Sequence, residues 1–320
     1  MRRITARVPA TVANLGPGFD CLGLAVGLYT DITLEADSGH AGMEVTGEGY
    51  DSLPTGRSNL VRRAIAHYFV TVDRALPSYW LHMHNRIPVS GGLGGSAAAI
   101  VGGLLLANEL NNNRLTRAEL LELATEIEGH PDNVGPALEG GMVVATHDGD
   151  KVISIKVPVP PTLRTVVFVP EFAMPTAEAR RILPRMVHRQ QAIFNIGRTA
   201  TLVAAMFSGR LDLLSVATQD QLHQPYRQQM FPAMPRFFDA ALGAGALGAY
   251  LCGAGSALMA FTSGAEAAVL AAFRRTSEEE SIPGRVGILD ICGRGAEVWH
   301  HDAPAVLPAH LDASLEQVAV

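Results

Sequence analysis

The chain has 320 residues, of which 48% are hydrophobic and 18% are charged, and its formal net charge is -6. This balance is typical of a folded protein and excludes an extended disordered chain, and the length is enough for about two domains. A net negative charge gives no general attraction for nucleic acid or an anionic membrane, so we expect neither of those partners and favour a small-molecule ligand.

The first part of the chain predicts a strand, a loop and a buried helix. Residues 4–8 alternate between apolar and polar side chains, which predicts an opening strand that ends at Pro9. A loop is expected over Asn14–Asp20. Ser96–Leu110 is small and apolar on nearly every side, which predicts a helix buried against close neighbours.

A second helix is marked at both of its ends. Thr116 and Glu119 form the pattern of a capping box, and Gly129 is placed to end the helix. Alternating residues over 142–145 and 152–157 then predict strands.

The second half begins after a cluster of prolines within residues 158–161, which we take as a domain boundary. The uninterrupted apolar run 166–169 predicts a strand buried on both faces, and helical periodicity follows over 190–207. Two apolar runs within 248–261 flank glycines and predict a strand, a tight turn and a second strand. The whole pattern predicts a mixed α+β protein in two lobes, with domains at 1–160 and 161–320.

Three cysteines, Cys21, Cys252 and Cys292, are widely spaced and form no CxxC pair, which disfavours a zinc site and a disulfide framework. We therefore expect a reducing, cytoplasmic location. No stretch reaches the roughly 18 uninterrupted apolar residues of a membrane span. Polar residues within 14–20 interrupt the first apolar stretch, so no signal peptide is expected.

The glycine-rich segment Pro88–Ala98 carries the clearest chemistry. Its glycines let backbone N–H groups turn inward, and the helix that follows adds the positive end of its dipole, an arrangement that cradles phosphates. A flexible connector is the plain alternative, but connectors seldom lead straight into an all-apolar helix. A Walker loop is excluded because it needs a lysine, and the only lysines are Lys151 and Lys156. The expected nucleotide-binding residues are Pro88, Val89, Ser90, Gly91, Gly92, Leu93, Gly94, Gly95, Ser96, Ala97 and Ala98.

Two further segments are suggestive. Asn14–Asp20 places two glycines and a proline between polar side chains, although an ordinary turn has the same composition. Glu128–Val134 packs a histidine, an aspartate and an asparagine around a proline, although a plain helix end could look the same.

Together these segments resemble the superfamily of galactokinase, homoserine kinase, mevalonate kinase and phosphomevalonate kinase, the GHMP kinases, and within it the homoserine kinase family most closely. Pro88–Ala98 looks like the superfamily pattern PxxxGLGSSAA. Pro9–Ala25 matches PxxxxNLGPGFDxxGLA, and Glu128–Gly141 matches EGHPDNVxPAxxGG. The likeness covers nearly the whole chain. It implies a two-lobed GHMP kinase fold, with a first lobe like domain 2 of ribosomal protein S5, a ferredoxin-like second lobe, and a homodimer.

The resemblance implies ATP and Mg²⁺ as cofactors. Backbone amides of Gly92–Ser96 would hold the phosphates, which leaves little covalent work for the protein. The implied metal ligands are Ser96 and Glu122, since Mg²⁺ prefers oxygen, although Glu119, Glu122 and Glu126 could equally form a solvated helix face.

The implied acceptor, L-homoserine, is a zwitterion, so its site needs an anion and cations at a fixed separation. Asp20 is the expected ammonium partner, and Arg180 and Arg227 suit a bidentate carboxylate clamp. The implied catalytic residues are Asn133, His130 and Arg180, and the implied substrate-binding residues are Asn14, Asp20, His130, Asn133, Thr176, Arg180 and Arg227. Related kinases carry a carboxylate base where Asn133 stands, so we expect catalysis by positioning and charge stabilisation.

Two positions depart from the family patterns. Gly95 replaces the first serine of the loop, and Asn85 stands where many members carry a lysine. Two alternative functions stay open: a kinase for another hydroxylated metabolite such as mevalonate, and an inactive homologue that senses metabolites.

Overall fold

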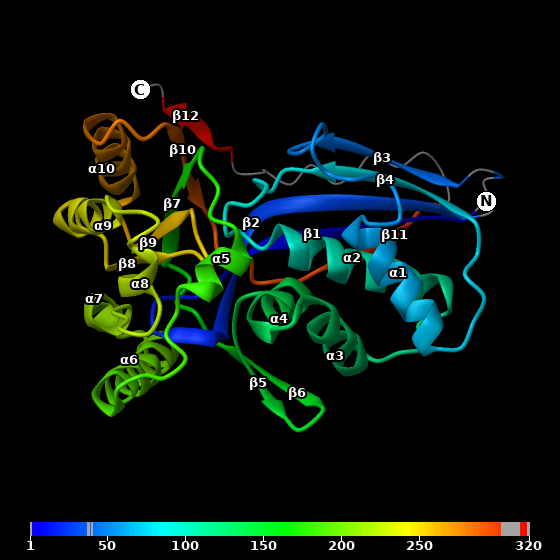
Figure 1. Ribbon diagram of the computed structural model, residues 1–320, viewed down its shortest axis with the longest axis horizontal. Helices are drawn as coiled ribbons and strands as arrows, with labels where there is room; N and C mark the ends of the chain where they lie inside the picture. Colours follow the sequence, from blue (N-terminus) through cyan, green and yellow to red (C-terminus); the bar gives the residue numbers. More distant parts are fainter. Residues whose placement is uncertain (1, 37–38, 40, 302–313, 319–320) are drawn as a thin grey trace.

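A computed structural model describes residues 2–36, 39, 41–301 and 314–318. Within these residues the chain forms two lobes side by side, each built on its own β-sheet (Figure 1). The predicted two-lobed α+β organisation is confirmed.

Two long strands dominate the first sheet, β1 (Arg2–Asn14) and β2 (Gly18–Ala36), which pair antiparallel along most of their length. The prediction that Pro9 ends the first strand was wrong. A register shift between Pro9 and Ala10 accommodates the residue that cannot donate a ladder hydrogen bond, and the strand continues to Asn14.

The remaining strands of the first sheet lie on both sides of this pair. Among the described residues the order is β11-β1-β2-β4-β3, while β5 pairs with β2 and β6 with β5. The predicted strands near residues 142 and 152 are confirmed as the β5–β6 hairpin. Their bounds are β3 (Gly42–Gly47), β4 (Tyr79–Asn85), β5 (Met142–Asp148), β6 (Lys151–Val157) and β11 (Glu297–His300).

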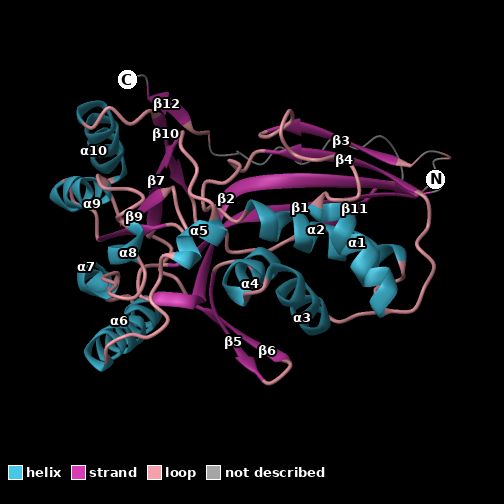
Figure 2. Ribbon diagram, viewed as in Figure 1, coloured by secondary structure: helices cyan, strands magenta, loops and turns pink. Residues whose placement is uncertain are grey.

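Helices α1 to α4 lie on one face of the first sheet (Figure 2). The buried helix is confirmed as α2 (Gly95–Leu110), which packs on β1 and beside α1 and α3. The capping box is also confirmed, because Thr116 and Glu119 exchange hydrogen bonds at the start of α3, and Gly129 ends it with φ 91°. The bounds of the other helices are α1 (Leu60–Thr71), α3 (Arg117–Glu128) and α4 (Pro131–Glu139).

The second sheet has the order β12-β10-β7-β9-β8 within the described residues. Its central strand β7 (Arg164–Pro170) is buried on both faces from residue 165 onward, as predicted. The predicted strand, turn and strand are β8 (Gly248–Leu251) and β9 (Leu258–Thr262). On the other side of β7 lies β10 (Gly284–Leu289), and β12 (Glu316–Val318) forms the edge beyond it.

Helices of the second lobe cover its sheet and extend toward the first lobe. Phe168 of β7 stacks on Phe237 of α9, with ring centroids 4.6 Å apart, and lies against Phe273 of α10. The predicted helix over 190–207 is confirmed as α6. The bounds are α5 (Thr176–Arg181), α6 (Arg189–Ser208), the 3-10 helix η1 (Leu211–Leu213), α7 (Leu214–Ala217), α8 (Gln224–Arg227), α9 (Met234–Gly243) and α10 (Glu266–Glu279).

The chain passes from the first sheet to the second between β6 and β7, and it returns once. β11 pairs with β1 through Ile4–Arg7, so the first sheet also draws on a segment from the end of the chain. The division into domains 1–160 and 161–320 stays a prediction. None of the helices in the described residues is long and apolar enough to cross a membrane.

Candidate active site

A cavity of about 360 Å³ lies where the glycine-rich loop, the β1–β2 turn and the start of the second lobe meet. The predicted loop residues Pro88 to Ser96 line it, whereas Ala97 and Ala98 are buried within α2. All the predicted acceptor residues line it too: Asn14, Asp20, His130, Asn133, Thr176, Arg180 and Arg227. Folding therefore brings two predicted sites, far apart in the sequence, to one cavity.

The loop shape depends on glycine at two positions. Gly92 and Gly94 have φ values of 76° and 70°, a region that other residues avoid. A Cβ on Gly94 would stand 2.0 Å from Thr11 Oγ1, and one on Gly92 would stand 2.3 Å from the carbonyl oxygen of Cys252. The loop is thus held against both lobes, and α2 starts directly after it with its positive end toward the cavity.

The structure accommodates both departures from the family patterns. Asn85 is buried. Its Oδ1 accepts a hydrogen bond from the backbone N–H of Ile87 at 3.1 Å, and its Nδ2 donates to the backbone carbonyl oxygen of Ile87 at 3.0 Å, which shapes the turn into the loop. At Gly95 a Cβ would meet its nearest neighbour, Ile87 Cγ2, at 3.8 Å, so a side chain has room there. Both positions are compatible with the loop conformation.

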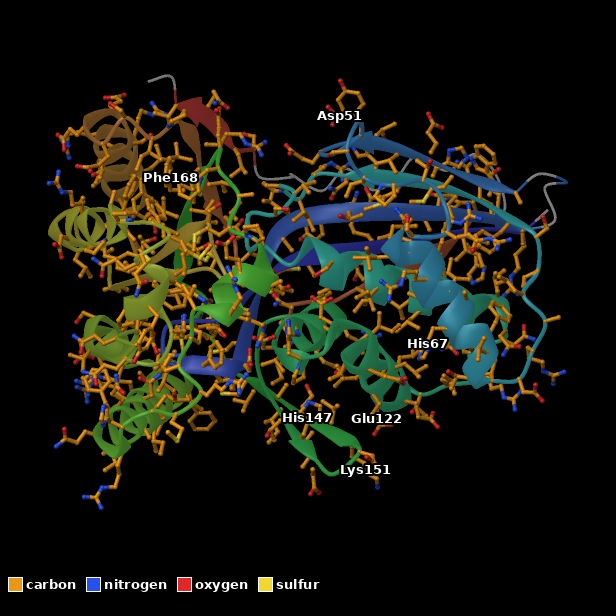
Figure 3. All side chains as sticks on the ribbon, viewed as in Figure 1. Asp51, His67, Glu122, His147, Lys151 and Phe168 are labelled. Carbon is orange, nitrogen blue, oxygen red and sulfur yellow. The ribbon has the colours of Figure 1, made fainter. Side chains whose placement is uncertain are left out.

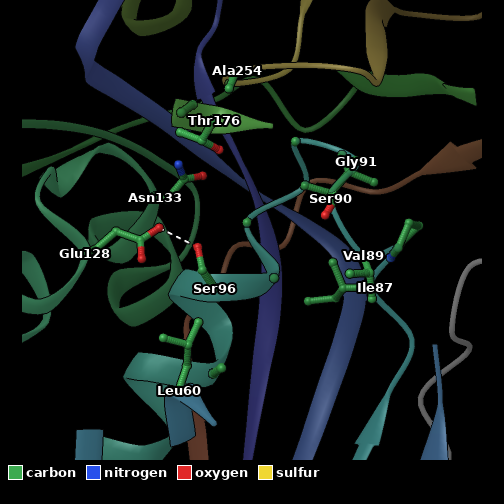
Figure 4. A pocket seen from close by; sticks show the side chains of 18 of the residues that line it. Leu60, Ile87, Val89, Ser90, Gly91, Ser96, Glu128, Asn133, Thr176 and Ala254 are labelled. Carbon is green, nitrogen blue, oxygen red and sulfur yellow. Dashed lines mark hydrogen bonds between the residues drawn. The ribbon is translucent and has the colours of Figure 1, made fainter. Parts of the chain in front are cut away.

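Ser96 and Glu128 bring a hydroxyl and a carboxylate together in the cavity. The Ser96 hydroxyl donates a 2.5 Å hydrogen bond to Glu128 Oε1 (Figure 4). Burial raises the pKa of Glu128, and the hydrogen bond from Ser96 opposes part of that increase. Glu122 is half-buried on α3 (Figure 3) and is not among the residues that line the cavity. The structure therefore brings Glu128, rather than the predicted Glu122, to Ser96.

Glu128 is the first residue of the EGHPDN segment, but the sequence pattern predicted no metal-binding role for it. Its place as the last residue of α3, directly before the turn to His130, was the available signal. The described residues contain no group of three or more His, Cys, Asp or Glu side chains that could hold a metal ion. Hydroxyl and carboxylate oxygens fit Mg²⁺ that takes its other ligands from phosphate and water.

His130 and Asn133 lie beside this pair at the start of α4. Burial acts to lower the pKa of His130, but the 2.6 Å hydrogen bond and the charge of Asp132 outweigh it, so the pKa lies above its ordinary value. Asn133 Oδ1 accepts a hydrogen bond from Thr11 Oγ1 at 2.9 Å, which leaves the Asn133 amide N–H groups as donors. Neither group has the character of a strong base.

The charged residues of the acceptor side already interact with one another. Asp20 and Arg180 form a bidentate pair, with N–O distances of 2.8 Å and 3.0 Å. Arg227 is 1% exposed, and its Nη1 donates to the carbonyl oxygen of Gly253 at 2.7 Å. Burial, and then the charge of Arg180, lower the pKa of Arg227 to about 10. The structure thus pairs Asp20 with Arg180, two groups predicted to hold opposite ends of the acceptor.

Family models match both lobes. The model of the GHMP kinases N terminal domain matches residues 59–141, and the model described as GHMP kinases C terminal matches residues 202–278. These matches define the class of the protein, which has both domains of a GHMP kinase.

Individual relatives narrow the class. Homoserine kinase of Moorella thermoacetica is 44% identical over 292 residues, which is 91% of this chain and 98% of the relative. Homoserine kinase of Synechocystis sp. is 40% identical over 302 residues, or 93% and 99% of the two chains. The crystal structure of homoserine kinase from Cytophaga hutchinsonii is 30% identical, with a TM-score of 0.84 over 93% of this chain and 97% of that chain. The chain belongs to the homoserine kinase family of the GHMP kinases.

Proposed function

We propose that this protein transfers the γ-phosphate of ATP to the hydroxyl group of L-homoserine, giving O-phospho-L-homoserine for threonine biosynthesis. The observation that carries the proposal is the single cavity that joins the glycine-rich loop to Asp20, Arg180 and Arg227. Its charges fit the carboxylate and ammonium groups of an amino acid, and the hydroxyl would lie between them and the phosphates. The likeness to homoserine kinases over most of the chain supports the same substrate.

The nucleotide side is built from backbone and two oxygen side chains. N–H groups of Gly92–Ser96 would bind the phosphates of ATP. Ser96 Oγ and the Glu128 carboxylate would hold Mg²⁺, and we assign to Glu128 the role predicted for Glu122. The bound ion would neutralise phosphate charge and fix the phosphoryl group for in-line transfer.

The acceptor side would position the hydroxyl group rather than deprotonate it strongly. Asn133 lines the cavity, and its amide N–H groups, which remain as donors, would orient the hydroxyl oxygen. His130, whose pKa is raised, would add positive charge near the phosphoryl oxygens. In a loose phosphoryl-transfer transition state the hydroxyl proton leaves late and can pass to water or to an oxygen of the transferred phosphoryl group, so positioning and charge stabilisation suffice.

An ADP-release assay with a panel of acceptors tests the proposal. We expect turnover with Mg·ATP and L-homoserine, and little with mevalonate, which has no ammonium group to pair with Asp20. Preference for mevalonate would favour a kinase for another metabolite. Stabilisation by ATP and homoserine in a thermal-shift measurement, without ADP release, would favour the metabolite sensor.

We also propose a homodimer that forms through α6. One side of this helix exposes Ile193, Ile196 and Phe207, which are 60%, 69% and 72% exposed. Gly197 and Ala200, both exposed, lie between the bulky residues, so a second helix could approach closely there. An antiparallel copy related by a two-fold axis would place each isoleucine end against the partner's Phe207 end and oppose the helix dipoles.

Sedimentation analysis with matched variants tests this interface. Ile196→Glu should convert the protein to a monomer, because a charge would be buried in the contact. Val70→Glu is the control, since Val70 is 78% exposed on α1, in the first lobe and away from α6. A monomeric wild-type protein, or an Ile196→Glu variant that remains dimeric, would contradict the assignment.

We further propose a cytoplasmic location, which suits the three free cysteines.

A further inference from the structure

His223 joins the two lobes at the acceptor side of the cavity. Its side chain is 0% exposed. Nε2 lies 2.7 Å from the carbonyl oxygen of Gly16, in the β1–β2 turn of the first lobe. Nδ1 lies 3.0 Å from Nη1 of Arg227, in α8 of the second lobe.

These two partners require one protonation state of the imidazole. The Gly16 carbonyl can only accept, so Nε2 carries the hydrogen, and the Arg227 guanidinium can only donate, so Nδ1 offers its lone pair. Burial lowers the pKa of His223, and the nearby charge of Arg227 acts in the same direction against Asp220. The ring is therefore neutral, in the Nε2–H tautomer.

Asp220 serves the backbone rather than the imidazole ring. Its carboxylate accepts from the backbone N–H groups of Leu222, His223 and Gln224, at 2.9 Å, 3.0 Å and 2.7 Å. The closest approach of His223 Nε2 to an Asp220 oxygen is 3.6 Å. Asp220 thus holds the turn that leads into α8, and His223 is free to bond Gly16 and Arg227.

A second link extends these hydrogen bonds into a ring on the acceptor side, which the backbone of residues 14–16 closes. The Gly253 carbonyl oxygen accepts from both Arg227 Nη1, at 2.7 Å, and Asn14 Nδ2, at 3.0 Å. Asn14 Oδ1 in turn accepts from the backbone N–H of Asp20 at 3.0 Å. The ring therefore connects Arg227 in the second lobe to Asp20 in the first.

We propose that His223 is a positioning residue, which sets the separation of Arg227 and Asp20 and thereby the fit of a zwitterionic acceptor. The proposal rests on the proposed function, because it concerns the same acceptor. A purely structural histidine would need only its buried volume and its stacking on Phe19, where the ring centroids are 5.3 Å apart. Two directed hydrogen bonds to opposite lobes are more than packing requires.

Two replacements separate the two bonds. In His223→Asn the side-chain oxygen can take the place of Nδ1 and accept from Arg227, but the bond to Gly16 is lost. In His223→Gln the side-chain N–H can take the place of Nε2 and donate to Gly16, but the bond to Arg227 is lost. His223→Leu keeps an apolar side chain and loses both bonds. Phe231→Leu, at a buried aromatic residue of the second lobe, controls for lost stability.

Steady-state kinetics in homoserine and in ATP give the decisive comparison. We expect His223→Leu to raise the KM for homoserine by about 10- to 100-fold, with kcat and the KM for ATP within about twofold. Asn and Gln should each restore part of the loss. Phe231→Leu should lower the melting temperature and leave both KM values unchanged. A His223→Leu variant with only a lower melting temperature, or with both KM values raised alike, would overturn the proposal.

Nitrogen NMR of the wild-type protein gives a test that does not depend on turnover. Long-range proton–nitrogen correlation should show His223 as the neutral Nε2–H tautomer with and without homoserine. An imidazolium ion or the Nδ1–H tautomer would contradict the inferred bonds. Failure of wild-type turnover with homoserine would reject the proposed function instead, so the two failures are distinguishable.

Discussion

The phosphate loop and the acceptor side of the same cavity are built in opposite ways. The loop is one contiguous segment, residues 88–96, and the groups that would bind phosphate are backbone N–H groups. The acceptor side is assembled from residues of segments 14–20, 130–133 and 176–180 and from Arg227, and side chains from both lobes supply its charges. One site depends on local conformation, whereas the other depends on how the lobes meet.

This difference decides which changes each part tolerates. A backbone-built loop is insensitive to side-chain chemistry but intolerant of a Cβ where φ is positive. A side-chain site tolerates conformational change poorly, because Asp20 and Arg180 must remain opposite each other across the lobes. Variants that strike one part should therefore leave the binding of the other substrate largely unchanged.

The largest effect is expected at Glu128, whose carboxylate lies between the phosphate loop and the acceptor side of the cavity. Glu128→Gln should lower turnover by about 100- to 1000-fold at ordinary Mg²⁺ concentration, because a neutral amide is a poor Mg²⁺ ligand. Glu122→Gln, six residues earlier on the same helix, is the matched control and should stay close to wild type. Turnover measured across a Mg²⁺ titration checks both variants.

A large loss of turnover in Glu122→Gln, with Glu128→Gln close to wild type, would instead assign Glu122 as the metal ligand. Lower pH offers a second check, since burial raises the pKa of Glu128. Glu128 should therefore become protonated at a pH where an exposed glutamate is still ionised, and its protonation should weaken Mg²⁺ binding. The Glu128→Gln variant should lose this pH dependence.

The loop itself should show the next largest effect. Gly94→Ala should raise the KM for ATP by on the order of 100-fold, because it combines a positive φ with a clash against Thr11. Gly95→Ala should be nearly silent, since its Cβ has space. Kinetics in ATP at saturating homoserine would show the contrast, and equal effects of the two variants would mean that the loop adapts.

Contiguous features were predictable from the sequence for a physical reason. The buried helix, the capping box at Thr116 and the loop before Ser96 each depend on residues within a few positions of one another. The strand through Pro9 was the exception, because a register shift against β2 does not appear in the residue pattern of β1.

Features that depend on tertiary contacts were less accessible. Spacing along α3 does not reveal which glutamate reaches Ser96, since that depends on how the helix end turns toward α4. The Asp20–Arg180 pair and the bonds of His223 join segments far apart in the chain. The resemblance predicted which residues would bind the acceptor, but the residue types could not predict which of these side chains form hydrogen bonds or ion pairs with one another.

Replacing either arginine tests the acceptor side. Arg180→Ala and Arg227→Ala should each remove a charge-assisted contact worth roughly 1.5 to 3 kcal/mol, which corresponds to about 10- to 150-fold in the KM for homoserine. Lysine should rescue poorly, because an ammonium group cannot make the paired contacts of a guanidinium. Parallel kinetics in both substrates check this. A raised KM for ATP with an unchanged KM for homoserine would assign these arginines to the nucleotide.

The smallest effect is expected from a local feature outside the cavity. Thr116 caps α3, and its hydroxyl accepts from the backbone N–H of Glu119 at 3.3 Å. Thr116→Ala should lower the free energy of unfolding by about 1 kcal/mol, because the backbone donor loses its partner. Thermal unfolding would show this as a shift of about 2 °C, and Thr116→Ser should restore stability. Because α3 carries Glu128 at its other end, unchanged Mg²⁺ dependence in Thr116→Ala would show that the cap contributes stability alone. A shifted Mg²⁺ dependence would mean that the start of α3 also helps to place Glu128. Local features such as the cap would then be less independent of the assembled cavity than proposed.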